Sequence, residues 1–186
     1  MANDVKQRMI EGASRLLATN GLQGTSFSEV LELTGAPRGS VYHHFPKGKN
    51  QLVEAAVDLA GQRAIDFLER KAGASAVEVA EYFLALWREV LVRSHFEAGC
   101  AVLAVTVAAD SPELLDHAAS VFRAWRHRLA ELLATGGLRA DAAPGFAALL
   151  VAACEGAVVV SRAEQSLEPF DLVSAQLVHQ VRALSA

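Results

Sequence analysis

Apolar residues recur at helical spacing along nearly the whole chain, and this period limits the fold more than any other feature. Near the start, Val5, Met9, Ala13 and Leu17 would lie on one face of a helix. No segment combines alternating β-branched residues with hairpin turns, and no repeat period is present. The sequence therefore predicts an all-α fold.

Capping residues and helix breakers divide this pattern into about nine helices. Asp4 and Gln7 resemble a capping box at the start of the first helix, and Asn20-Gly21 is a typical helix end. A longer helix is expected after Gly48, with Gly73–Ser75 as the first break beyond it. The helices that follow are expected at 76–94, 99–109, 112–134, 143–165 and 170–184.

Charge is distributed unevenly along the 186 residues. The whole chain has a net charge of −4 and is 52% hydrophobic, so it can bury a large core. Residues 1–50 carry a net charge of +2 and residues 51–186 a net charge of −6. No carboxylate occurs between Glu32 and Glu54. This local positive region could contact phosphate, or it could be an ordinary solvated face.

Two short helices with a tight turn between them are predicted in residues 26–45. Ser26 and Glu29 form a capping box at the first, Pro37 suits the first turn of the second, and Phe45-Pro46 closes it. Gly35 supplies the left-handed residue that such a turn requires. The pattern is typical of a helix-turn-helix, whose second helix enters the major groove of DNA.

The expected second helix leaves a polar rim without carboxylates. Arg38 could bond guanine or phosphate, Gly39 and Ser40 would allow close approach, and Tyr42 and His43 could contact phosphate or thymine methyl groups. Other interpretations remain open at this point. Tyr42 and Phe45 could be core aromatics, and Lys47 could be merely solvated. His43 and His44 have no third metal ligand nearby in the sequence.

The segments Thr25-Ser26-Phe27, Ser40–Phe45 and Lys49–Leu52, together with Gly35, closely resemble the DNA-binding module of TetR-family regulators. The segment from Ala36 to Pro46 is similar to the LmrA/YxaF-like subgroup, which responds to drugs and flavonoids. The resemblance implies a DNA-binding domain at 1–48 and an effector-binding and dimerisation domain at 49–186. It implies DNA contacts from Thr25, Ser26, Arg38, Gly39, Ser40, Tyr42, His43, His44, Lys47 and Lys49. Pro37 and Thr34 depart from the family pattern, which weakens any transfer of operator sequence.

The C-terminal two thirds are expected to hold an effector cavity and a dimer interface. The alternative is that their aromatic residues only fill a helical core. The candidate effector-binding residues are Phe67, Trp87, Leu91, Phe96, Cys100, Leu103, Phe122, Trp125 and Cys154. Small residues at four-residue spacing would let a second subunit pack closely, as TetR-like proteins do. The candidate dimer residues are Ala148, Ala152, Gly156, Leu172, Gln176 and His179.

Other protein classes find little support. There is no nucleophile–base motif, Gly-rich phosphate loop or HExxH, so an enzyme, a cofactor and a metal site are not expected. The apolar stretches are shorter than a membrane span and no leader is evident, so a cytoplasmic protein is expected. The sequence thus predicts a homodimeric repressor that a small aromatic or apolar effector releases from operator DNA. A DNA-binding protein that needs no ligand is the alternative.

Overall fold

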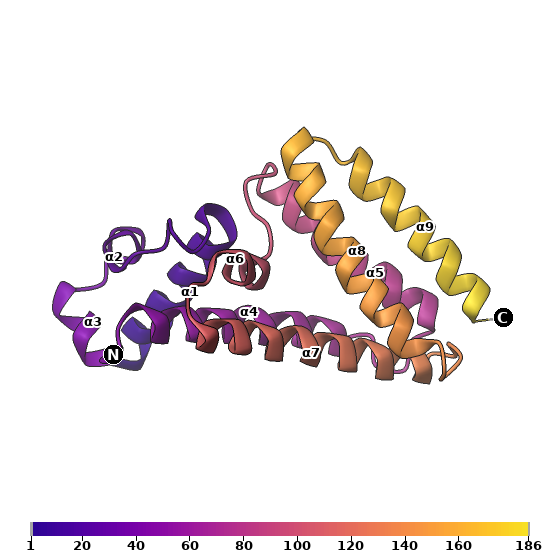
Figure 1. Cartoon of the computed structure of the whole chain (residues 1–186), viewed down its shortest axis with the longest axis horizontal. Helices are drawn as coiled ribbons and strands as arrows, with labels where there is room; N and C mark the ends of the chain where they lie inside the picture. Colours follow the sequence, from indigo (N-terminus) through magenta and orange to yellow (C-terminus); the bar gives the residue numbers. More distant parts are fainter. Residues whose placement is uncertain (1, 186) are drawn as a thin grey trace. The chain divides into compact units, whose positions relative to one another are not determined.

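The computed structural model describes residues 2–185 and contains nine helices and no strand within them (Figure 1). The all-α prediction is confirmed. The helices are α1 (Ala2–Asn20), α2 (Phe27–Thr34), α3 (Arg38–His44), α4 (Lys49–Glu69), α5 (Ala76–Arg93), α6 (Ala101–Ala108), α7 (Pro112–Thr135), α8 (Ala143–Glu164) and α9 (Glu168–Leu184).

Most predicted helix ends are correct to within two residues, and the differences have local causes. Asp4 does not cap α1, because it already lies in the first helical turn, where its carboxylate is 3.7 Å from the Arg8 guanidinium. The helix expected from residue 99 starts at Ala101, because Cys100 is extended and its Sγ accepts the Leu103 N–H. The last helix starts at Glu168, since proline is tolerated in a first turn.

The chain packs into two compact units. Unit 1 comprises residues 2–63 and 100–122, and unit 2 comprises residues 64–99 and 123–185. Helices α4 and α7 each contribute residues to both units. The sequence analysis placed a boundary between residues 48 and 49, which separates a DNA-binding domain from an effector-binding domain. The packing units are divided at other positions. The functional boundary stays a prediction.

Unit 1 is built around α1, which packs against α2, α3 and α6. Met9, Ala13 and Leu17 form its buried stripe, as the period predicted. Gly12 allows the close approach of α2, because a Cβ at this position would lie 2.5 Å from the Thr34 Cγ2. The helix-turn-helix therefore packs so closely on α1 that a side chain at position 12 would force Thr34 to move.

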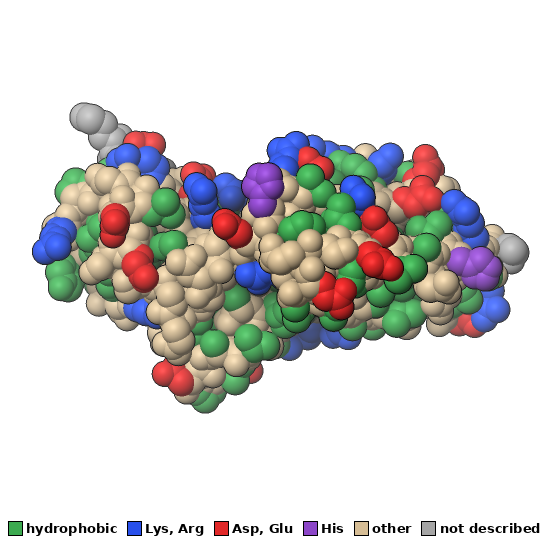
Figure 2. Space-filling view, turned by 90° about the horizontal axis from the view of Figure 1, so that it is seen from above, with side chains coloured by type: hydrophobic (Ala, Val, Ile, Leu, Met, Phe, Trp, Pro, Cys, Tyr) green, Lys and Arg blue, Asp and Glu red, His purple; other side chains and the backbone are tan. Residues whose placement is uncertain are grey.

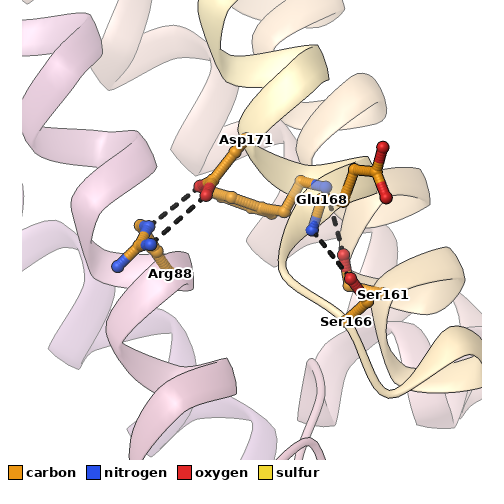
Figure 3. Close-up of polar contacts among 6 residues, drawn as sticks. Arg88, Ser161, Ser166, Glu168 and Asp171 are labelled. Atoms are coloured by element: carbon orange, nitrogen blue, oxygen red, sulfur yellow. Dashed lines mark hydrogen bonds and ion pairs between the residues drawn. The ribbon is translucent and has the colours of Figure 1, made fainter.

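In unit 2, α5 packs against both α8 and α9. Arg88 on α5 makes a bidentate ion pair with Asp171 on α9, with N–O distances of 2.9 and 3.2 Å (Figure 3). Nearby, the Ser161 Oγ accepts the Phe170 N–H at 3.1 Å, which joins α8 to the start of α9 (Figure 3). These contacts hold α9 in one register on its neighbours.

Helix α8 is the most apolar long helix among the described residues. By length and composition alone it could cross a membrane, but half of its most apolar window is buried in the structure. Buried apolar helices of folded domains share this composition.

Candidate nucleic-acid interface

The N-terminus of α2 is organised by the predicted capping box. The Ser26 Oγ accepts the Glu29 N–H at 3.2 Å, and the Glu29 carboxylate accepts the Ser26 N–H at 2.7 Å. Hydrogen bonds from the side chain and then the backbone of Ser26 lower the pKa of the Glu29 carboxyl. The box therefore stabilises α2 at neutral pH and is lost as the pH falls through that lowered pKa.

Thr25 requires a correction. Its side chain was expected to contact DNA, but it is 1% exposed and its hydroxyl donates to the Gly21 carbonyl at 2.8 Å. A buried, hydrogen-bonded hydroxyl cannot reach a phosphate without breaking that contact. In this structure Thr25 supports the connection between α1 and α2.

The turn between α2 and α3 follows the expected geometry with one change. Gly35 is left-handed (φ 63°), and its N–H donates to the Leu31 carbonyl at 2.9 Å. Pro37 lies just before the helix in an extended conformation, whereas the sequence suggested the first helical turn. The Ser40 hydroxyl donates to the Pro37 carbonyl at 2.5 Å, so it reinforces the start of α3 from within.

Two buried residues fix the orientation of α3. Val41 and Phe45 are both buried, and the Phe45 ring lies 6.4 Å from the Phe27 ring, measured between centroids. The choice between core and surface that the sequence left open is thereby decided. Phe45 is a core residue, whereas Tyr42 is 82% exposed.

The opposite face of α3 is open and carries no carboxylate. Arg38, Gly39, Tyr42 and His43 are exposed, and His44 is half-buried with its ring against His43. A Cβ at Gly39 would meet nothing within 4 Å, so internal packing does not require glycine there. A missing side chain on an exposed helix face instead allows another molecule to approach the backbone.

Two lysines flank this face near the start of α4. Lys47 is exposed, and its N–H donates to the Gln51 side chain at 3.1 Å. The Lys49 ammonium donates to the Leu22 carbonyl at 2.8 Å, which ties α4 to the connection between α1 and α2. An ammonium has three donors, so the bond to Leu22 does not use its full capacity. The sequence offered no sign of this tether.

The chain matches two models of known families. Residues 9–56 match bacterial regulatory proteins of the tetR family, and residues 76–176 match the C-terminal domain of LmrA/YxaF-like transcriptional regulators. The HTH-type transcriptional regulator Rv0196 of Mycobacterium tuberculosis (strain H37Rv) is 34% identical over 179 residues, which cover 92% of this chain and 91% of the relative. The chain belongs to the TetR family.

Other relatives agree with this TetR-family assignment. YxaF of Bacillus subtilis (strain 168), also an HTH-type transcriptional regulator, is 27% identical over 183 residues, which cover 96% of both chains. A TetR regulatory protein of Rhodobacter sphaeroides has a similar structure, with a TM-score of 0.82 at 22% identity over 93% of this chain and 96% of that one. At that identity, the structural likeness shows the fold alone.

The candidate effector residues of this TetR-family chain do not all lie in one unit. Phe67, Trp87, Leu91, Phe96, Trp125 and Cys154 lie in unit 2, whereas Cys100, Leu103 and Phe122 lie in unit 1. Trp87 and Trp125 touch edge to face, with ring centroids 6.3 Å apart. Phe67 stacks on Tyr82 at 4.0 Å, a partner that the sequence analysis missed because α4 and α5 meet only in the folded chain.

The two cysteines are buried. Burial, followed by the charge of the neighbouring Glu155, raises the pKa of the Cys154 thiol well above its ordinary value. Cys154 is therefore a protonated, apolar side chain at neutral pH.

The candidate dimer residues lie mostly on the outside of α8 and α9. Ala152, Gly156, Gln176 and His179 are exposed, Ala148 is half-buried, and Leu172 is 63% exposed. Leu149, Val159 and Val160 on α8 are also exposed, which extends the apolar surface. In Figure 2, hydrophobic side chains reach the surface among charged ones over the right-hand part of the view, the side where Figure 1 shows these helices.

Proposed function

We propose that the protein is a homodimeric transcriptional repressor that reads operator DNA with α3 and leaves it when a small aromatic or apolar molecule binds. The observation that carries this proposal is the exposed face of α3. It presents Arg38, Gly39, Tyr42 and His43 without a carboxylate, on a helix anchored by buried Val41 and Phe45. We place this activity in the cytoplasm, where bacterial DNA lies.

The chemistry of this face suits a DNA duplex. Tyr42 and His43 can donate hydrogen bonds to phosphate oxygens, and Arg38 can bond the two acceptor atoms of guanine in the major groove. Lys47 and Lys49 add positive charge beside the start of α4, whose free amide groups also attract anions. The acidic remainder of the chain limits attachment to nucleic acid elsewhere on its surface.

A second subunit would supply the second recognition helix. Dimeric helix-turn-helix proteins place two recognition helices about 34–36 Å apart, so that each enters a successive major groove. The exposed small and apolar residues of α8 and α9 would pack against their copies in a four-helix interface. This pairing would relate the two α3 helices by a twofold axis.

Release by the effector is proposed to be a population shift. The effector would bind better to a conformation in which the two α3 helices no longer match the groove spacing. The coupling then equals the difference in effector affinity between the two states, typically about 1–3 kcal/mol. The aromatic residues of unit 2, including the contact between Trp87 and Trp125, support a binding site there.

Replacing Lys49 by alanine is expected to weaken operator binding and to flatten its salt dependence by about one unit of slope, because one phosphate contact is lost. Fluorescence anisotropy with labelled operator at several salt concentrations measures both effects. Lys71→Ala is the matched control, since the Lys71 ammonium lies over the Tyr82 ring in unit 2. Equal salt slopes for all three proteins would show that Lys49 serves only as a tether to Leu22.

Arg38→Ala is expected to lower affinity for the operator more than for random DNA. A bidentate contact with guanine discriminates against other bases by about 1–3 kcal/mol. The operator is first selected from a random pool with the wild-type protein. Selection is then repeated with the variant, which should relax one position of each half-site. Equal losses on operator and random DNA would instead make Arg38 a phosphate contact.

The repressor proposal as a whole is tested by titrating the selected operator with the protein, with and without a panel of aromatic drugs and flavonoids. We expect one protected site with two half-sites, and release by at least one member of the panel. If operator is bound but no compound changes its affinity, a ligand-independent DNA-binding protein becomes the better description. Failure to select any sequence would contradict the regulator proposal itself.

A further inference from the structure

Unit 1 exposes four large hydrophobic side chains among its described residues, and the proposed function uses only one of them. Leu33, Tyr42, Val107 and Leu115 are 44%, 82%, 74% and 41% exposed. Tyr42 lies on the proposed DNA-reading face. The other three lie beside α1 or where α6 leads into α7. A single exposed leucine is ordinary, so the charges around each one decide whether it marks a contact.

Leu33 lines a groove between α1 and α2, called the α1–α2 groove below. The groove has a volume of about 320 Å³ and is open to solvent. It is lined by Arg8, Glu11, Gly12, Arg15, Leu33 and Thr34. Its floor is apolar, because a Cβ at Gly12 would lie 2.5 Å from the Thr34 Cγ2 and 3.8 Å from the Leu33 Cδ2. Small-molecule sites enclose most of their ligand, so this open groove better fits a side chain from another protein surface.

The α1–α2 groove carries one positive charge that the chain does not balance. The Arg8 guanidinium lies 3.7 Å from the Asp4 carboxylate, and the Glu11 carboxylate lies 3.4 Å from the Arg63 guanidinium. Arg15 is exposed and forms no ion pair with any described residue. Arginine beside an apolar floor is typical of protein interfaces, and its planar donors suit a carboxylate.

The start of α7 combines an exposed leucine with the opposite charge. Asp110, Glu113 and Asp116 are exposed, and none of them forms an ion pair with a described residue. Leu115 lies between the last two of these acids in the sequence. Residues 94–122 contain no Lys or Arg. This surface, residues 110–116, is therefore acidic and apolar, which complements the α1–α2 groove.

We propose that the α1–α2 groove of one molecule docks the start of α7 of a second copy of the chain. Leu115 enters the groove over Gly12 and against Leu33, and the Asp116 carboxylate pairs with Arg15. Each copy carries both surfaces in unit 1, so the contact is head-to-tail and can extend from copy to copy. The Glu11 carboxylate in the groove disfavours a phosphate chain as the occupant.

The contact is small, so it is weak between free molecules. One inserted leucine and one exposed ion pair bury far less than the roughly 1,200 Å² of a stable interface. Molecules held at adjacent sites on one DNA face each other at an effective concentration of about a millimolar. We therefore expect cooperative occupation of neighbouring operators. This consequence rests on the proposed function, whereas the association of the protein alone does not.

Charge reversal at each surface tests the docking without DNA. Arg15→Glu makes the groove more acidic, and Asp116→Arg makes the start of α7 more basic. Sedimentation velocity at low salt measures association beyond the proposed dimer. The wild type should associate as its concentration rises and should lose this association at high salt, which screens exposed charges. Each variant alone should associate about tenfold more weakly, because an attraction becomes a repulsion.

An equimolar mixture of the two variants gives the decisive result. The acidic groove of one variant then meets the basic α7 start of the other, and the two unchanged surfaces also meet. The mixture should therefore recover wild-type association. Arg126→Glu is the matched control, since it makes the same charge change at an exposed arginine of α7 in unit 2 and should associate like the wild type. Circular dichroism checks that the variants are folded.

The second measurement compares DNA with one selected operator and DNA with two, at a series of spacings. Two operators should bind the wild type about tenfold more tightly than independent sites would, which is the effect of one weak contact. Arg15→Glu should remove this factor. Its affinity for a single operator should change no more than that of Arg126→Glu, and a larger fall would make Arg15 a DNA contact and overturn the inference.

Three results of the sedimentation experiment would also overturn it: no salt-sensitive association of the wild type, association that survives both reversals, or a mixture that does not recover it. The wild-type salt dependence decides the matter even if a variant fails to fold. Intact operator binding without association defeats this inference alone. Failure of the wild type to bind any selected operator would instead defeat the proposed function.

Discussion

Phe45→Ala is expected to lower the free energy of unfolding of unit 1 by about 3–5 kcal/mol, the usual cost of deleting a fully buried aromatic ring. The Phe45 side chain is 1% exposed and packs on Phe27 across the helix-turn-helix. Without it, the C-terminal end of α3 loses its anchor, so we expect operator binding to be lost as well. Hydrogen exchange of the amides in α2 and α3 reports local stability, and anisotropy reports DNA affinity.

Tyr42→Ala is the matched control, because it removes an aromatic ring of similar size from the exposed side of the same helix. Its stability should stay within about 0.5 kcal/mol of the wild type. Its operator affinity should nevertheless fall about tenfold, through loss of a contact of roughly 1.4 kcal/mol. Destabilisation by Tyr42→Ala, or protection of α3 unchanged in Phe45→Ala, would contradict the orientation of α3 described above.

Gly156→Arg is expected to convert the protein to monomers at micromolar concentration. The proposed interface would bury two unpaired guanidinium groups, one from each subunit, at a cost of several kcal/mol per charge. A monomer holds a single half-site, so operator affinity should fall by about a hundredfold or more. Sedimentation velocity measures the association state, and anisotropy measures the affinity.

The fold of each subunit should survive this change. A Cβ at position 156 would meet nothing within 4 Å, so arginine has room in the isolated chain. Ala124→Arg, at an exposed alanine of α7 in the same unit, controls for added charge and should leave the dimer intact. A Gly156→Arg protein that sediments as a dimer would move the interface away from this part of α8.

Short-range features were predictable because neighbouring residues decide them. Ser26 and Glu29 form their capping box and Gly35 its left-handed turn, since both depend on backbone geometry within a few residues. The same local rule failed for Asp4, because a capping residue must stand outside the helix and Asp4 is inside it. Helix ends were therefore best predicted where a breaker and a cap occur together.

The surroundings of individual side chains were less predictable. A helical period shows which residues share a face, but it does not show what packs against that face. Thr25 was expected at the DNA surface and is buried, since its hydroxyl bonds the end of α1. Lys49 reaches the Leu22 carbonyl, 27 residues earlier in the chain. Cys100 caps α6, a role that the sequence analysis did not foresee, and its contact with an effector stays a prediction. The Lys49 contact depends on a partner that only packing brings close, whereas Thr25 and Cys100 bond residues three or four positions away.

The sequence by itself determined the all-α architecture, the approximate positions of the helices and the carboxylate-free stretch around α3. Periodicity, capping and charge depend on residues that are close together in the sequence, so they can be recognised without the structure. Only the tertiary structure decided which side of α3 faces outward, through the burial of Val41 and Phe45. It alone also placed Leu33 and Thr34 beside α1, where they line a groove with Arg15. Burial and the shape of a surface depend on residues far apart in the chain, so no local pattern can specify them.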